Sequence, residues 1–125
     1  LVTARGTDEL KAITPEETKL WLREFSDPDR GDLAFWSEAL RRDLVENRGY
    51  TLLSEGKIED ASGNVGTELL LEATIQGRAV RELLALFVFP GAFEHRIRVV
   101  ELVGEKEPFE AALPEVRASI KTLNP

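Results

Sequence analysis

The hydrophobic pattern between residues 69 and 103 predicts three consecutive strands joined by two tight glycine turns. The first strand, TELLLEATI, runs to Gln76–Gly77, the second, VRELLALFVF, to Pro90–Gly91, and FEHRIRVVELV follows. In the first strand, apolar side chains alternate with polar ones, as expected for a strand with one buried face. The second strand is apolar on both faces, with Leu84, Leu86 and Val88 on one side and Leu83, Ala85 and Phe87 on the other. A sheet with such a strand requires cover on both faces.

Two segments show helical periodicity. In the first, Asp32 is predicted to cap a helix that runs to about Arg48 and ends before Gly49. Its apolar stripe, at spacings of three and four, consists of Leu33, Trp36, Leu40 and Leu44. The second segment, EKEPFEAALPEVRASIKTL, carries a stripe of Phe109, Leu113, Val116, Ile120 and Leu123. Pro114 does not suit a helix interior, so we expect a kink or a two-part helix.

The remaining segments are shorter. Residues 1–6 are predicted as an edge strand, and Thr14–Pro15–Glu16–Glu17 resembles a helix start. Residues 19–25 and 50–58 are predicted strands, and Ser62–Gly63–Asn64 a turn. Together the elements predict an α+β fold in which an antiparallel β-sheet is covered by helices on both faces, an α/β/α sandwich, in a single domain over residues 1–125.

Composition excludes several classes of protein. The chain has 125 residues, of which 42 % are hydrophobic and 31 % charged, as in ordinary globular domains. The net charge of -7 opposes binding to a phosphate backbone, so we expect no nucleic-acid partner. No cysteine is present, which excludes disulfides and thiol chemistry. The first residue is Leu1, which we interpret as a processing boundary after a removed leader or linker.

The order of these elements resembles the PsbP-like fold. The resemblance covers about residues 19–123 and rests on DLAFWSEALRRDL, GTELLLEATIQGRAVRELLALFVF, RIRVVELVG and FEAALPEVRASIKTL. The group includes the oxygen-evolving protein of the photosystem, the Ran-binding Mog protein and small bacterial envelope lipoproteins of the DcrB type. The resemblance implies an antiparallel sheet between helical layers and a non-catalytic accessory role, and it transfers no site residue.

Catalytic chemistry is not expected from this sequence. The single histidine, His95, shares a strand face with Glu101, but six positions of strand separate them by about 20 Å. No G-x-S-x-G motif, P-loop or pair of metal-ligand histidines occurs. The carboxylates are predicted to lie on loops and outward strand faces, where they cannot converge. We therefore predict no enzyme activity, no catalytic residue, no cofactor and no metal.

Two groups of acidic residues have simple structural interpretations. The loop Asp27–Pro28–Asp29–Arg30–Gly31–Asp32 echoes a calcium loop, but its glycine is displaced and Arg30 intrudes, so a helix cap and a solvated turn explain it better. Glu55, Glu59 and Asp60 are interpreted as a solvated turn. Arg41, Arg42 and Arg48 are assigned to the outer face of the first helix, with Glu38 and Arg42 forming an i, i+4 pair.

The aromatic residues give the only indication of a recognition surface. Phe35 and Trp36 are adjacent on a helix, so both cannot point at one core, and one of them is expected at a groove or partner contact. Trp21, Phe35 and Trp36 are the candidate contact residues.

The function predicted from these observations is a non-catalytic accessory or binding domain of a bacterial cell-envelope protein. It acts through contacts with an unknown protein partner, and a removed leader or a lipid anchor before Leu1 would tether it to the membrane. The alternative is a carrier of a small apolar ligand held between the helix of residues 32–48 and the sheet. A cytoplasmic location is the alternative to the envelope.

Overall fold

A computed structural model describes residues 2–4, 8–13 and 18–124 of the chain, and side chains from residue 18 onward. In these residues the strands are β1 (Val2–Ala4), β2 (Asp8–Ile13), β3 (Lys19–Asp27), β4 (Thr51–Glu59), β5 (Val65–Ile75), β6 (Arg78–Phe89) and β7 (His95–Glu105). The helices are α1 (Leu33–Arg42), continued by a π-helical turn η1 (Asp43–Asn47), and α2 (Lys106–Ile120).

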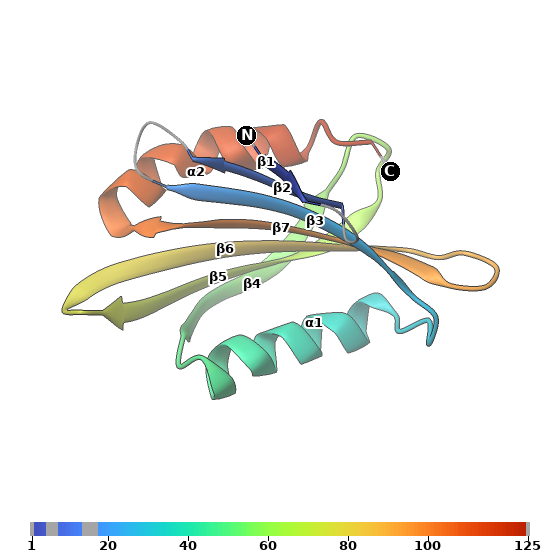
Figure 1. Cartoon of the computed structure of the whole chain (residues 1–125), viewed down its shortest axis with the longest axis horizontal. Coiled ribbons are helices and arrows are strands. Elements are labelled where there is room, and N and C mark those ends of the chain that lie inside the picture. Colours follow the sequence, from blue (N-terminus) through green and yellow to red (C-terminus); the bar gives the residue numbers. More distant parts are fainter. Residues whose placement is uncertain (1, 5–7, 14–17, 125) are drawn as a thin grey trace.

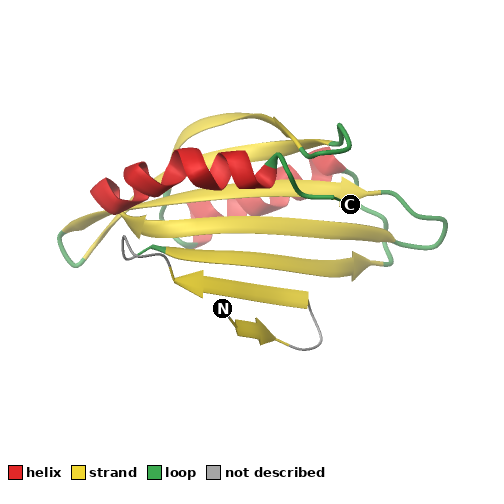
Figure 2. Ribbon diagram, turned by 90° about the horizontal axis from the view of Figure 1, so that it is seen from above, coloured by secondary structure: helices red, strands yellow, loops and turns green. Residues whose placement is uncertain are grey.

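All neighbouring strands pair antiparallel in the order β1-β2-β3-β7-β6-β5-β4. Figure 2 shows the strands side by side, with the N-terminal strands along one edge of the sheet. The α+β class and the antiparallel sheet are therefore confirmed. The predicted edge strand is confirmed over Val2–Ala4, while the predicted helix start at Thr14–Pro15–Glu16–Glu17 lies outside the described residues.

One helix lies against each face of the sheet (Figure 1). Alternation along β6 separates two cores: Leu83, Ala85 and Phe87 pack with α2, whereas Leu84 and Leu86 pack with α1. These five side chains are at most 2 % exposed. The two-faced apolar pattern of this strand thus corresponds to burial on both faces. Because each face has a single helix, helical cover of the sheet is partial.

Local sequence signals explain where α1 begins, where η1 ends and where β5 turns into β6. The N–H of Phe35 donates to Asp32 Oδ1 over 2.8 Å, which makes Asp32 the N-cap as predicted. Gly49 follows η1 with φ of +76°, a left-handed conformation that favours glycine. Gln76 and Gly77 also have positive φ and form the tight β5–β6 turn.

The helices match the predicted extents but differ in detail. Helical structure runs from the Asp32 cap to Asn47, close to the predicted end at about Arg48, but it becomes π-helical from Asp43. The second helix is one continuous element from Lys106 to Ile120 with Pro114 inside it, so the two-part alternative was wrong. Its buried stripe, Phe109, Ala112, Val116 and Ile120, holds it on the sheet on both sides of the proline. Tertiary packing here outweighs the local cost of proline.

Candidate functional site

An open cleft lies between the C-terminal end of α1 and the sheet. Its volume is about 450 Å³, within the usual range for small-ligand sites. The lining combines Trp21 and Arg23 of β3, Leu40, Asp43, Leu44, Arg48 and Tyr50 around the end of the helix, and Glu82, Leu84, Val99, Glu101 and Val103 of the central strands. The cleft occupies the place where the sequence predicted a ligand, but charged side chains share its walls with apolar ones.

Strand register brings the two acids of the floor together. Glu82 is in phase with Leu84 and Leu86 on β6, and so it points to the face that carries α1. Leu84 pairs with Glu101 of β7, which places Glu101 diagonally across from Glu82 on that face. Trp21 of β3 pairs with Glu101 on the other side. The carboxylates thus converge on an inward face, and the prediction that they would lie only on loops and outward faces was wrong.

Glu82 is an unusual buried acid. Its side chain is 3 % exposed, and within the described residues its Oε2 atom has no hydrogen-bond partner. Burial raises the pKa of Glu82 to about 8, and the neighbouring Glu101 carboxylate adds to the shift. The carboxyl group of Glu82 therefore holds a proton at neutral pH. Burial also raises the pKa of Tyr50, with a further contribution from Glu82.

Two arginines face acids in the cleft. Arg23 Nη2 lies 4.0 Å from Glu101 Oε1, which is a loose ion pair. Arg48 Nε lies 3.2 Å from Asp43 Oδ2 at the rim, across η1. The extra residue of a π-helical turn changes the spacing along the helix, and such turns occur often at functional sites. The assignment of Arg48 to the outer helix face was wrong, because Arg48 lines the cleft.

The three predicted contact residues do not form one surface. Trp21 lines the cleft. Trp36 packs against the sheet, with its ring 5.5 Å from that of Phe25, and its indole N–H donates to Asp27 Oδ2 over 2.9 Å. Phe35 is 58 % exposed on the far side of Trp36. Of the pair, Phe35 is therefore the residue that faces away from the core, and its contact with a groove or a partner stays a prediction.

The acidic loop after β3 is a hydrogen-bonded cap. Asp27 is buried and accepts from the N–H groups of Asp29 and Gly31 and from Trp36. Burial raises the pKa of Asp27, but these donors outweigh it, so the pKa lies below its usual value. His95 Nδ1 lies 3.0 Å from the carbonyl oxygen of Gly31 and joins β7 to this loop. In the part of the chain that the structure describes, no three acid or histidine side chains are placed to hold a metal ion.

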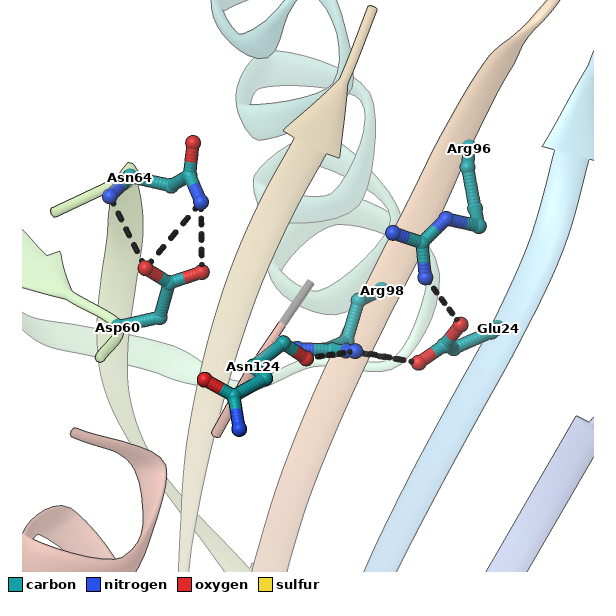
Figure 3. A network of polar contacts seen from close by, with 6 residues as sticks. All are labelled: Glu24, Asp60, Asn64, Arg96, Arg98 and Asn124. Carbon is teal, nitrogen blue, oxygen red and sulfur yellow. Dashed lines mark hydrogen bonds and ion pairs between the residues drawn. The ribbon is translucent and has the colours of Figure 1, made fainter. Parts of the chain in front are cut away.

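A second charged cluster lies on the face that carries α2 (Figure 3). Glu24 of β3 accepts from Arg96 over 2.7 Å and from Arg98 Nε over 2.8 Å, and Arg98 Nη2 donates to the carbonyl oxygen of Asn124 over 2.7 Å. Burial raises the pKa of Glu24, but the two arginines outweigh it and lower the pKa. Both guanidinium groups also lie over the ring of Phe89. This cluster ties the C-terminus to the sheet.

Asp60 is also more ordered than predicted. It is 5 % exposed and accepts from Asn64 (Figure 3). It also accepts from the N–H of Ser62, so it builds the β4–β5 turn. Glu55 lies within β4 and forms an ion pair with Arg41 over 2.8 Å. The interpretation of Glu55, Glu59 and Asp60 as one solvated turn was therefore wrong. The predicted pair of Glu38 and Arg42 is present at 2.7 Å.

Comparison with solved structures shows the fold. The chain is similar to PA94 of Pseudomonas aeruginosa, a protein of unknown function, with a TM-score of 0.64 and 17 % identity over 99 % of this chain and 85 % of that one. It is also similar to LpqN, which is involved in cell envelope biogenesis of Mycobacterium tuberculosis, with a TM-score of 0.63 and 11 % identity over 100 % and 82 % of the two chains.

These likenesses define a structural class without naming a family. No family model matches the chain, and no curated protein matches it in sequence. The resemblance to the PsbP-like fold stays a prediction. Within the described residues, no helix combines the length and the apolar character needed to cross a membrane.

Proposed function

We propose that this chain is a non-catalytic binding domain of the bacterial cell envelope and that the open cleft beside η1 is its binding site. The observation that carries the proposal is Glu82, a nearly buried carboxyl group at the cleft floor whose Oε2 atom has no partner. Buried polar atoms are normally hydrogen-bonded, and an orphaned one in a cleft suits a ligand that supplies the missing partner.

Fold and comparison support the setting. The similar protein LpqN is involved in cell envelope biogenesis. The PsbP-like resemblance implies a non-catalytic accessory role, which agrees with this setting, and we retain the resemblance as a proposal. Fractionation of the source cells tests the location: we expect the protein with the envelope, and recovery in the cytosol alone would contradict it.

The mixed lining favours a ligand with a polar group over an apolar one. Five of the lining residues are ionisable acids or arginines, namely Arg23, Asp43, Arg48, Glu82 and Glu101. An apolar ligand in this cleft would remove these groups from water without giving them partners, which costs free energy. The predicted carrier of an apolar ligand is therefore the weaker proposal.

Protein contact fits the same site. Phe35 is a single exposed aromatic side chain on α1, which is far less than the surface that a specific protein interface buries. We propose instead that a partner protein inserts a side chain into the cleft, as a small molecule would insert its polar group. In either case the cleft, and not the outer face of α1, carries recognition.

The two tryptophans allow a direct test. The chain contains two tryptophan residues, of which Trp21 lines the cleft and Trp36 is half-buried against the core of the α1 face, outside the cleft lining. In a Trp36→Phe variant, the remaining Trp21 gives the fluorescence signal from the cleft. In a Trp21→Phe variant, the remaining Trp36 gives the signal from the packed face of α1. In a screen of small amines, acids, sugars and alcohols, we expect at least one compound to change the fluorescence of the first variant only. A screen in which no compound does so would refute the cleft as the binding site.

A further inference from the structure

Building on the proposed function, we infer that the cleft binds the ammonium group of an organic cation, held by the carboxyl groups of Glu82 and Glu101 and by the faces of Trp21 and Tyr50. The bound chemistry is an alkylammonium group. Its source is a free amine or the lysine side chain of a partner protein.

Charge in the cleft favours a cation. Three acids and two arginines line it, so the ionised groups balance while Glu82 holds its proton, and one negative charge is in excess once Glu82 ionises beside a bound cation. Arg48 faces Asp43 at the rim over 3.2 Å and lowers the pKa of Glu82 only in part, whereas Arg23 is 4.0 Å from Glu101, and its Nε atom also has no hydrogen-bond partner in the described residues. An ammonium group on the floor would separate the two floor carboxyls and give Glu82 Oε2 the partner that it lacks. The net charge of -7 also attracts cations to the surface.

The aromatic and aliphatic walls suit the rest of such a ligand. Trp21 and Tyr50 line the cleft, and aromatic rings attract ammonium groups. Leu40, Leu44, Leu84, Val99 and Val103 supply apolar surface for an alkyl chain behind the charge. The opening to solvent leaves room for a longer molecule or a peptide backbone outside the cleft. A compact inorganic ion would leave this apolar surface uncovered.

Binding of a cation is expected to release a proton. Glu82 is protonated at neutral pH, and an adjacent ammonium group lowers its pKa so that it ionises. The groups that face it are Arg23 from β3, Asp43 and Arg48 from η1 and its end, Tyr50 before β4 and Glu101 from β7. A lysine-type amine keeps its charge below about pH 10. Affinity should therefore rise at least tenfold from pH 6 to pH 8.

The experiment is isothermal titration calorimetry with n-butylammonium and with a capped Gly-Lys-Gly peptide as the two amine sources. Buffers of different ionisation heat report the released proton. Glu82→Gln removes the ionisable floor group, and Glu38→Gln, which lies 57 % exposed on α1, removes the same charge away from the cleft. We expect binding by at least one source, a loss of at least tenfold in Glu82→Gln and a change of less than twofold in Glu38→Gln. Thermal unfolding of both variants verifies folding.

The outcomes separate the sources and the two proposals. Stronger binding of butylammonium assigns a free amine, and stronger binding of the peptide assigns a lysine side chain; either supports the inference. Binding that Glu82→Gln leaves unchanged overturns it, as does failure of both amines at millimolar concentration. Binding of butyrate or of calcium ions in their place, detected through Trp21, overturns the cation inference while the cleft remains a binding site.

Discussion

Each face of the sheet buries a cluster of charged side chains, and the two clusters are neutralised to different degrees. On the α2 face, Glu24 lies between Arg96 and Arg98 with both of its oxygens bonded, and of this cluster Arg98 Nη1 has no partner in the described residues. On the α1 face, Glu82 lies beside another acid, and its Oε2 atom has no partner in the described residues. The first cluster closes a contact within the protein, whereas the second opens into a cleft.

The difference distinguishes a buried acid that holds the fold together from a buried acid that belongs to the proposed binding site. Neutralised buried charges are compatible with a stable fold, whereas an unmatched acid destabilises it and could be replaced by an apolar residue of similar volume. Local rules of folding are broken most often at functional sites. The α1 face also contains an acid whose hydrogen bonds are satisfied, Asp27, near the N-terminal end of α1. The unmatched acid therefore belongs to the cleft and not to the face as a whole.

The largest effect on stability is expected for a substitution near the N-terminal end of α1. Trp36→Ala removes a large aromatic packed against the sheet and a donor to Asp27, and it should lower the free energy of unfolding by about 4 kcal/mol. Phe35→Ala, at an exposed position, should cost less than about 1 kcal/mol. Urea titration measures both. The reverse order would mean that the packed end of the helix has been misassigned.

Glu24→Gln should be nearly as damaging. The change leaves Arg98, whose side chain is 6 % exposed, without its opposite charge, and we expect a loss of about 3 kcal/mol at pH 7. The pKa of Glu24 is lowered on folding, so its contribution is present above its ordinary value of 4.5 and is lost as pH falls through the folded value. The variant should therefore be less sensitive to acid than the wild type. Stability curves from pH 2 to pH 7 measure this, and an unchanged acid limb would contradict it.

Glu82→Gln should change the free energy of unfolding in the opposite direction, and by less than Glu24→Gln does. The pKa of Glu82 rises from 4.5 to about 8 on folding, so the native state binds more protons in that range and the stability of the wild type falls as pH rises through it. Glutamine cannot ionise. The variant should be about as stable as the wild type at pH 5 and more stable by about 2.5 kcal/mol at pH 7. A variant that is less stable at both pH values would show that Glu82 is a structural acid.

Much of the fold was predictable because its signals are local. The period of two in β5, the two-faced run in β6, the Asp32 cap and Gly49 follow from neighbouring residues. The π-helical turn and the unbroken α2 were not predictable from neighbouring residues. Both lie where Leu44 and the α2 stripe pack against the sheet, and tertiary packing overrides local propensity. β2 was missed because its polar sequence gains its structure from pairing with β3.

The site needed tertiary information. Period two alone places Glu82 in phase with Leu84, and Glu101 in phase with Ile97 and Val99, and a charged residue on an apolar face was a signal that the sequence contained. Their approach depends on the β6–β7 register, and the cleft depends on where α1 ends, neither of which the pattern fixes. Arg48 and Tyr50 join the site through the conformation after η1.

Carbon-13 NMR of the side-chain carboxyl groups tests the central comparison most directly. In one pH titration of the wild type, followed from pH 2 to pH 10, the account predicts that Glu82 titrates near pH 8 while Glu24 titrates below its ordinary value of 4.5. Glu82→Gln and Glu24→Gln assign the two resonances. Titration of Glu82 below pH 5, alongside Glu24, would contradict the account, because the cleft would then hold an ordinary ionised acid.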